Sequence, residues 1–298
     1  FNFIDRGLLN MKAKVHVPAK INLALDILGR RDDGYHFVEM IMQSVDLYDT
    51  ITVDINTKKN IELSSNVNIT DNIEKNTAYM AAEQFLKDTK IENPGVKIII
   101  KKKIPMQAGL AGGSADAAGV ILALNKLFNT QLTQDRMFEI GEKIGADVPF
   151  CIGGGTMFSE GIGTILEPIP DLPECYIVLS KPPIGVSTKE AYEKSDISEY
   201  IGTIKVKETV DAVCSGDLIK ISSLLFNRFE HVMNLQEVNN IKKIMQDMGA
   251  LNACMSGSGP TVFGIFNSPF KAEHSFLRLK KQYDETFLCK PVSGCIIE

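Results

Sequence analysis

Several short segments in the first hundred residues have the apolar content and two-residue alternation of β-strands. The predicted strands are 14–17, 21–28, 45–55, 61–63 and 96–100. Asp33 and Gly34, which follow the second of these, form a dipeptide typical of hairpin turns. Helical spacing begins after Asn76, which is predicted to cap a helix. The N-terminal part is therefore predicted to be mainly β-structure with one early helix.

The remainder of the chain has more helical spacing. Helices are predicted at 114–128 and 133–144, and Gly145 is predicted to follow the end of the second one. Beyond residue 160 the predicted helices are 188–195, 205–215, 217–230, 235–247 and 269–283. The predicted strands there are 176–179, 251–255, 261–266, 286–290 and 293–297. We therefore predict an α+β fold of two domains, residues 11–160 and 161–298.

Composition narrows the class of protein. The 298 residues, of which 44% are hydrophobic, are sufficient for two packed cores. No stretch approaches the ~18 apolar residues of a membrane span, so no membrane contact is expected. The net charge of −5 and the lack of a long basic run argue against a nucleic-acid partner. Residues 1–10 are expected to be a leader or an added remnant, and the oligomeric state is not indicated.

Cysteine and histidine spacing gives no sign of a metal site. The six cysteines include no C-x-x-C pair, and the four histidines include no H-E-x-x-H pattern. Reduced thiols in a cytoplasmic protein without a structural metal are therefore expected. Lys101, Lys102 and Lys103 form the only basic triplet, which either serves a compact anion or is a solvated strand end.

The strongest chemical signal is a glycine-rich segment between a predicted strand and a predicted helix. Gly109, Gly112 and Gly113 allow the backbone to approach a ligand closely, and the N-terminus of the following helix favours an anion. The segment lacks the Gly-Lys-Ser/Thr of the standard P-loop, and no G-x-G-x-x-G follows a strand. It is predicted to bind phosphate, although tight strand–helix packing is the alternative.

The arrangement Pro-x-x-x-Gly-Leu-x-Gly-Gly-Ser-x-x-Ala-Ala at 105–118 resembles the second motif of GHMP kinases. The first motif is similar to Pro-Ala-Lys-Ile-Asn-Leu at 18–23, and the third to Met-Ser-Gly-Ser-Gly-Pro-Thr-Val-Phe at 255–263. Together the resemblance covers most of residues 14–298. It implies the two-domain GHMP kinase fold and ATP-dependent phosphorylation of an alcohol, with Mg²⁺ accompanying the nucleotide. The implied phosphate-loop residues are Pro105, Gly109, Leu110, Ala111, Gly112, Gly113 and Ser114.

Two further segments resemble one branch of that family, namely Gly-Tyr-His at 34–36 and Gly-Ala-Asp-Val-Pro-Phe at 145–150. This branch phosphorylates the 2-hydroxyl of the cytidine diphosphate conjugate of methylerythritol in non-mevalonate isoprenoid synthesis. Other GHMP kinases, acting on mevalonate, phosphomevalonate or homoserine, are the alternatives. A GHMP-fold sensor without catalysis is a third hypothesis, against which the intact set of Lys20, Ser114 and Asp147 argues.

The resemblance also assigns the reacting groups. Asp147 is predicted to accept the hydroxyl proton, with a turn or helix-cap aspartate as the alternative. Lys20 and Asn22 should share one face of a strand and point into the same site, since side chains alternate along a strand. Ser114 is the expected protein contact of Mg²⁺, or a helix N-cap, and Asp116 is expected only to complement the helix dipole.

The cytosine of such a substrate needs an aromatic surface and hydrogen-bonding groups, and Tyr35 and His36 offer both. A second segment, at 182–192, is similar to the family's other base-binding segment. It places Tyr192 on the opposite face of the cytosine and Thr188 nearby, although a core tyrosine at 192 is the alternative. Gly257 and Gly259 are expected to give the third motif an architectural role beside the phosphate loop, or merely to form a tight connection.

Overall fold

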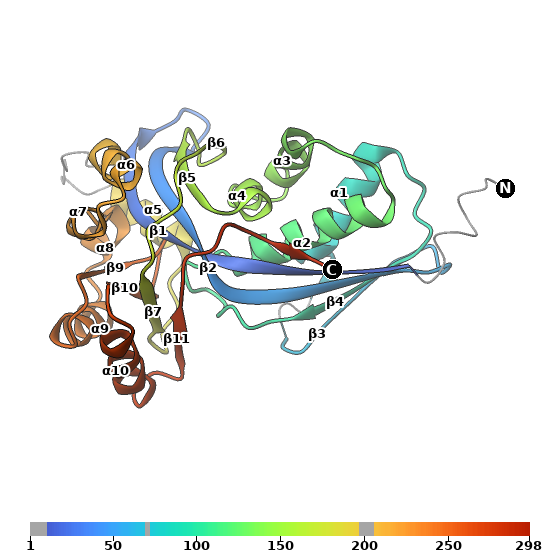
Figure 1. Cartoon of the computed structure of the whole chain (residues 1–298). Helices are drawn as coiled ribbons and strands as arrows, with labels where there is room; N and C mark the ends of the chain where they lie inside the picture. Colours follow the sequence, from blue (N-terminus) through green and yellow to red (C-terminus); the bar gives the residue numbers. More distant parts are fainter. Residues whose placement is uncertain (1–10, 69–71, 197–205) are drawn as a thin grey trace.

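The computed structural model describes residues 11–68, 72–196 and 206–298. The expected leader at 1–10 and the first residue of the helix predicted at 205–215 lie outside these residues. The described chain forms two lobes joined by long strands that extend through both (Figure 1). The combination of sheets and covering helices confirms the predicted α+β fold.

The first sheet is built on a long antiparallel pair, β1 (Lys12–Arg30) and β2 (His36–Ile55). The strands predicted separately at 14–17 and 21–28 are one strand, because a shift of register between Pro18 and Ala19 accommodates the proline without ending the pairing. Within the described residues this sheet has eight strands, with the order β12-β1-β2-β4-β3 along its main path. The others are β3 (Ile61–Ser65), β4 (Val96–Lys101), β5 (Thr156–Glu160), β6 (Ile165–Pro168), β8 (Phe226–Asn227) and β12 (Ile296–Ile297).

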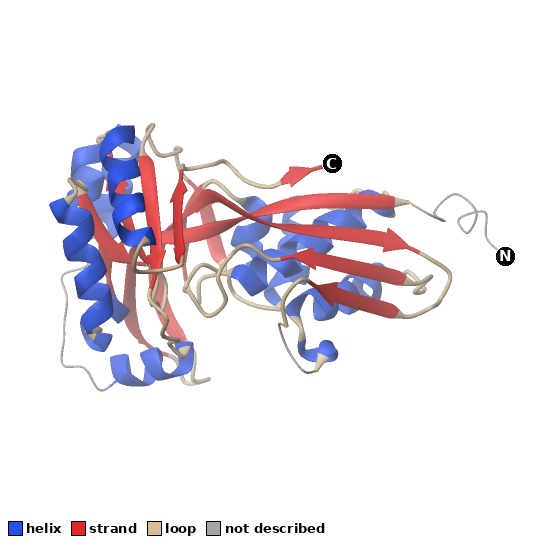
Figure 2. Cartoon of the chain, turned by 90° about the horizontal axis from the view of Figure 1, so that it is seen from below, coloured by secondary structure: helices blue, strands red, loops and turns tan. Residues whose placement is uncertain are grey.

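Helices cover one face of this sheet, as Figure 2 shows from below. They are the 3₁₀ turn η1 (Ile73–Lys75), α1 (Thr77–Thr89), α2 (Gly112–Leu127), α3 (Gln134–Glu142) and α4 (Val148–Gly153). Asn76 caps α1 as predicted, since its side chain accepts a hydrogen bond from the Ala78 N–H. The prediction that Gly145 follows the end of α3 is wrong. That helix ends at Glu142, and Lys143 is its C-cap in a right-handed conformation.

The second lobe contains a sheet of four described strands in the order β11-β7-β10-β9. They are β7 (Tyr176–Lys181), β9 (Asn252–Met255), β10 (Val262–Phe266) and β11 (Glu285–Cys289). The helices of this lobe are α5 (Thr188–Asp196), α6 (Val206–Ser215), α7 (Leu218–Ser223), α8 (Arg228–Met233), α9 (Gln236–Asp247) and α10 (Pro269–Lys280). The single helix predicted at 217–230 is two helices, because β8 intervenes and pairs in parallel with β1.

Three strands that follow residue 160 belong to the first sheet. The first sheet continues through β6, which pairs with β5 and ends at Pro168. β8 and β12 then bring later parts of the chain back to β1. The domain boundary near residue 160 therefore remains a prediction.

Among the described residues, none of the helices has both the length and the apolar character that crossing a membrane requires.

Candidate active site

One cleft of about 1560 Å³ gathers most of the residues singled out in the sequence. From the first lobe, the predicted site residues that line it are Lys20, Tyr35, His36, Pro105, Gly109, Ala111, Gly112, Gly113, Ser114 and Asp147. From the second, Thr188, Tyr192 and Gly257 line it. Asn22, Leu110 and Gly259 are buried and do not line it. The cleft therefore brings together motifs that are far apart in the sequence.

The glycine-rich segment opens directly into α2. Ala111 is the N-cap in a left-handed conformation, with φ of 58°, and no side chain caps the helix there. The N–H groups of the first turn are consequently left for a ligand, with the positive end of the helix dipole behind them. Ser114 lies within the first turn, so the alternative that it is the N-cap is wrong. An atom added as Cβ at Gly145 would lie 4.0 Å from the Ser114 Oγ, so this hydroxyl lies near the 145–147 turn.

The third motif holds the phosphate loop through backbone contacts. The Ser256 Oγ donates a hydrogen bond to the Gly109 carbonyl at 2.9 Å. Gly109 has φ of +72°, and a Cβ there would lie 2.0 Å from the Ser256 carbonyl oxygen. Gly257, with φ of +54°, faces the same peptide, and its Cβ would lie 2.9 Å from the Gly109 oxygen. Only glycine allows the two loops to approach this closely.

A buried charge cluster fixes both ends of the phosphate loop. The Lys102 Nζ lies 2.5 Å from Asp49 Oδ2 and 2.9 Å from Asp116 Oδ2, and it donates to the Gly112 carbonyl at 3.1 Å. Asp49 Oδ1 also accepts the N–H groups of Lys103 and Ile104. Since the ammonium has only three N–H donors, Lys102 is occupied by the protein itself. Lys102 is therefore neither free to bind a phosphate nor part of a solvated strand end, so neither prediction made for the lysine triplet describes it.

Asp116 belongs to this cluster, so the expectation that it serves only the helix dipole is wrong. Burial, reinforced by the neighbouring Asp49, raises the pKa of Asp116 to about 7 despite the opposing effect of Lys102. Its Oδ1 atom is buried without a hydrogen-bond partner. The two carboxylates and one ammonium hold the start of α2 against the strand end.

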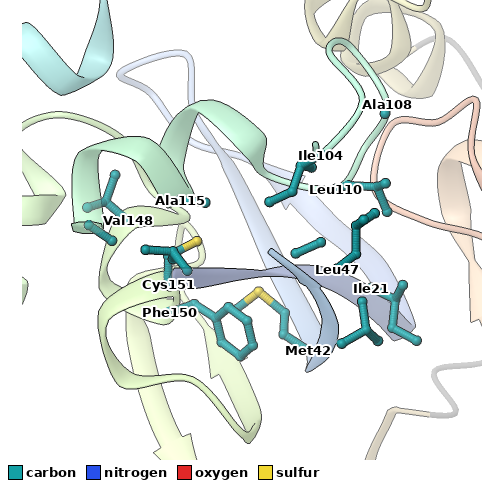
Figure 3. Close-up of a cluster of buried hydrophobic side chains, with 14 of the residues drawn as sticks. Ile21, Met42, Leu47, Ile104, Ala108, Leu110, Ala115, Val148, Phe150 and Cys151 are labelled. Carbon is teal, nitrogen blue, oxygen red and sulfur yellow. The ribbon is translucent and has the colours of Figure 1, made fainter. Parts of the chain in front are cut away.

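The loop is also anchored by apolar side chains, as Figure 3 shows. Ile104, Ala108 and Leu110 belong to a buried cluster that also contains Ile21 of β1 and Phe150 of α4. The Leu110 side chain therefore faces the core rather than the cleft, and its carbonyl accepts the Lys20 N–H at 3.3 Å. Core packing thus sets the height of the loop above β1.

Lys20 and Asn22 lie on the same face of β1, as the alternation predicts. The Lys20 Nζ donates to Asn22 Oδ1 at 2.7 Å and lies 3.8 Å from Asp147 Oδ2. Lys20 and Asn22 are buried, at 4% and 0% exposure. Asp147 occupies the N-cap position of α4, but its side chain makes no capping hydrogen bond. The structure thus gives the Asp147 carboxylate a lysine neighbour and an open side toward the cleft instead of a capping role.

Three aromatic residues line the same cleft, namely Tyr35, His36 and Tyr192. Tyr35 is exposed, whereas the His36 ring stacks on the Tyr192 ring with their centroids 4.6 Å apart. His36 Nε2 lies 2.6 Å from Asp196 Oδ1. Burial raises the pKa of Tyr192 to about 12, so this phenol stays neutral. Thr188 Oγ1 lies 3.0 Å from Ser258 Oγ, which links α5 to the third motif.

Comparison with known proteins identifies the family. The chain matches the GHMP kinases N terminal domain over residues 76–155 and the GHMP kinases C terminal region over 209–285. A 4-diphosphocytidyl-2-C-methyl-D-erythritol kinase of Clostridium beijerinckii is 41% identical over 94% of this chain and 100% of its own length. The chain belongs to the GHMP kinase family, in the branch of 4-diphosphocytidyl-2-C-methyl-D-erythritol kinases. It is therefore an ATP-dependent small-molecule kinase.

Two further relatives agree with this placement in the GHMP kinase family. The kinase of the same name from Alkaliphilus metalliredigens is 44% identical over 92% of this chain and 95% of that protein. A crystal structure of 4-(cytidine 5'-diphospho)-2C-methyl-D-erythritol kinase superimposes with a TM-score of 0.80 at 28% identity, covering 94% of this chain and 100% of that one. The predicted GHMP kinase fold is confirmed.

Sequence reasoning missed several residues that shape this GHMP kinase cleft. Lys102 and Asp49 were not paired, because a lysine in a basic triplet resembles a solvated strand end. Asp196 and Asn227 lie outside all of the family motifs. Their only signals are an aspartate four residues after Tyr192 and an asparagine at the start of a helical segment.

Proposed function

We propose that this kinase transfers the γ-phosphoryl group of ATP to the 2-hydroxyl of 4-(cytidine 5'-diphospho)-2-C-methyl-D-erythritol, a step of non-mevalonate isoprenoid synthesis. The observation that carries the proposal is the single cleft, which has a phosphate loop, a lysine–aspartate pair and an aromatic group along its walls. The names of the relatives support the same substrate. Its diphosphate would lie between the base and the reacting hydroxyl.

The residues present fit a nucleotide with its metal ion. The uncapped start of α2 offers N–H donors to the phosphates, and the Ser114 hydroxyl offers an oxygen atom of the kind that Mg²⁺ prefers. We propose Ser114 as the protein contact of Mg²⁺. When bound, this ion neutralises charge on the phosphate oxygens. The Lys102 cluster contributes by holding Gly112 and the first turn of α2 in place.

Proton transfer is assigned to Asp147. We propose that its carboxylate accepts the proton of the 2-hydroxyl as the oxygen attacks the γ-phosphorus. Lys20, 3.8 Å away, stabilises negative charge on the carboxylate and on the attacking oxygen. Asn22 keeps the Lys20 ammonium in position through the 2.7 Å hydrogen bond. A positioned base of this kind typically contributes ~10²–10⁴-fold to the rate.

The aromatic residues of the cleft are assigned to the cytosine. We propose that Tyr35 stacks on the base and that His36 meets its hydrogen-bonding edge. The sequence placed Tyr192 on the other face of the base, but the His36 ring already covers the Tyr192 ring. We therefore propose that Tyr192 acts by supporting His36, and that Thr188 contributes through its contact with Ser258.

The cytoplasm is the proposed compartment. All six cysteines are free thiols, and four of them are buried. Thiols of this kind are typical of proteins that work under reducing conditions. ATP, the phosphoryl donor, points to the same compartment.

A coupled ATPase assay with a panel of alcohols tests the proposal. The cytidylyl conjugate should be phosphorylated well, while methylerythritol, mevalonate, phosphomevalonate and homoserine should be poor substrates. Asp147→Asn is the control that ties turnover to this cleft. Phosphorylation of mevalonate or homoserine, with none of the conjugate, would overturn the substrate. A wild-type protein that turns over none of these alcohols would favour another substrate or the sensor hypothesis.

A further inference from the structure

One buried side chain connects the third motif to the short helix beneath the base site. Asn227, at the end of β8, is 1% exposed and has a partner for each of its side-chain groups. Its Nδ2 donates to the carbonyls of Met255 and Gly257, at 2.7 and 2.8 Å. Its Oδ1 accepts the N–H groups of Phe229 and Glu230, at 2.8 and 3.4 Å, and so caps α8.

The hydrogen bonds that the Asn227 Nδ2 donates connect it, through Gly257, to Asn22 and Lys20. Because Asn227 holds the Gly257 carbonyl, the orientation of the Gly257 loop backbone is fixed. The Gly257 N–H donates to Asn22 Oδ1 at 3.0 Å, the same oxygen that accepts from Lys20. Lys20 in turn lies beside Asp147. A displaced Gly257 would thus remove one of the hydrogen bonds that orient Asn22 Oδ1, the acceptor of the Lys20 ammonium.

The hydrogen bonds that the Asn227 Oδ1 accepts connect it, through Phe229, to the proposed cytosine site. Phe229, whose N–H is capped by Asn227, meets the Tyr192 ring edge-on with centroids 4.9 Å apart. Tyr192 carries the stacked His36 ring. The two sides of one amide therefore support different parts of the cleft, and they can be separated chemically.

We propose that Asn227 is a positioning residue for phosphoryl transfer, which acts through Gly257 on the Lys20–Asn22 pair. This role rests on the proposed function, in which that pair serves catalysis. Asn227 does not line the cleft and touches none of the reacting groups itself. Its effect should therefore fall on turnover more than on substrate binding, because the Gly257 N–H reaches the catalytic pair directly, whereas the phosphate loop keeps its own hydrogen bond from Ser256.

Asn227→Ser isolates the donor side. Serine is as good an N-cap as asparagine, so α8 and the base site keep their support, while the bonds to Met255 and Gly257 are lost. We expect kcat to fall about 10–100-fold, since small displacements of catalytic groups can cost that much. The KM values for ATP and for the cytidylyl conjugate should stay within about threefold of wild type.

A matched control is Asn252→Ser. Asn252 begins β9, whereas Met255, which accepts from Asn227, ends it. Asn252 Nδ2 donates to the Ser222 carbonyl at 2.8 Å and Oδ1 accepts the Ala253 N–H at 2.9 Å, so this variant also removes side-chain hydrogen bonds to the backbone, at a partly buried site away from the cleft. It should lower the melting temperature and leave kcat unchanged. Equal losses of kcat in the two variants would mean a general stability effect and would overturn the proposal.

A double-mutant cycle supplies the second readout. If Asn227 acts through Asn22, then Asn227→Ser should cost little further turnover in an Asn22→Ala background, whereas independent effects would multiply. Multiplying losses, or a folded Asn227→Ser with wild-type kcat, would refute the role. If Asn227→Ser does not fold, Gly257→Ala displaces the same peptide with Asn227 intact, and wild-type kcat there refutes it equally. Failure of the wild-type protein to phosphorylate the conjugate would instead count against the proposed function.

Discussion

Gly109 provides the sharpest test of how the phosphate loop is seated. Its φ of +72° is left-handed, and a Cβ would lie 2.0 Å from the Ser256 carbonyl oxygen and 3.0 Å from the Gly259 nitrogen. Because both atoms are backbone, neither can rotate away. Gly109→Ala should therefore combine the left-handed strain of about 1–2 kcal/mol with an overpacking cost of about 1–3 kcal/mol. The expected loss in the free energy of unfolding is about 2–5 kcal/mol.

Gly216→Ala separates the two contributions. Gly216 has φ of +68°, but a Cβ there would meet nothing within 4 Å. It should lose only the strain of about 1–2 kcal/mol in urea unfolding. Because the loop shifts away from Ser256, calorimetric titration with ATP should show Kd raised about tenfold or more for Gly109→Ala, equivalent to about 1.4 kcal/mol, and unchanged for Gly216→Ala. Equal unfolding losses in the two variants, with equal ATP affinity, would show that the loops are not in close contact.

The remaining predictions concern the reacting groups and the base. Asp147→Asn should lower kcat by ~10²–10⁴-fold with ATP affinity retained, because the phosphate loop is untouched; near-normal turnover in steady-state assays would remove Asp147 as the base. Burial raises the pKa of Asp116 from 3.8 to about 7, so the folded chain binds this proton more tightly than the unfolded chain does. The free energy of unfolding should therefore fall as pH rises from about 4 to 7, by at most about 1.4 kcal/mol per pH unit, and Asp116→Asn should remove this contribution. Urea unfolding at several pH values checks this, and the same pH dependence in both proteins would contradict it. Tyr35→Ala should weaken calorimetric binding of the cytidylyl conjugate by ~1–3 kcal/mol, and unchanged affinity would rule out stacking.

Much of the site was predictable because it is encoded locally. A period of two placed Lys20 and Asn22 on one face of β1, and a glycine-rich turn before an apolar helix predicted the phosphate loop. The lengths of the elements were less certain. Pro18 interrupts the pattern, yet a register shift carries β1 through it, since pairing with β2 outweighs the local signal. Of the three glycines in this turn, only Gly109 has a positive φ, whereas a Cβ added at Gly112 would meet the Lys102 and Ile104 side chains.

The sequence by itself determined the family and the order of the motifs, and it predicts the role of Asp147, because these depend on residue type and short spacing. Only the tertiary structure decided how these groups are held. Lys102 looks like part of a surface triplet in the sequence, but in the structure it forms buried ion pairs with Asp49 of β2 and Asp116 of α2. Asn227 meets Gly257 across 30 residues of chain. Such pairings join segments that are distant in sequence, and burial requires each polar group to find whichever partner the fold brings near, so no local pattern could specify them.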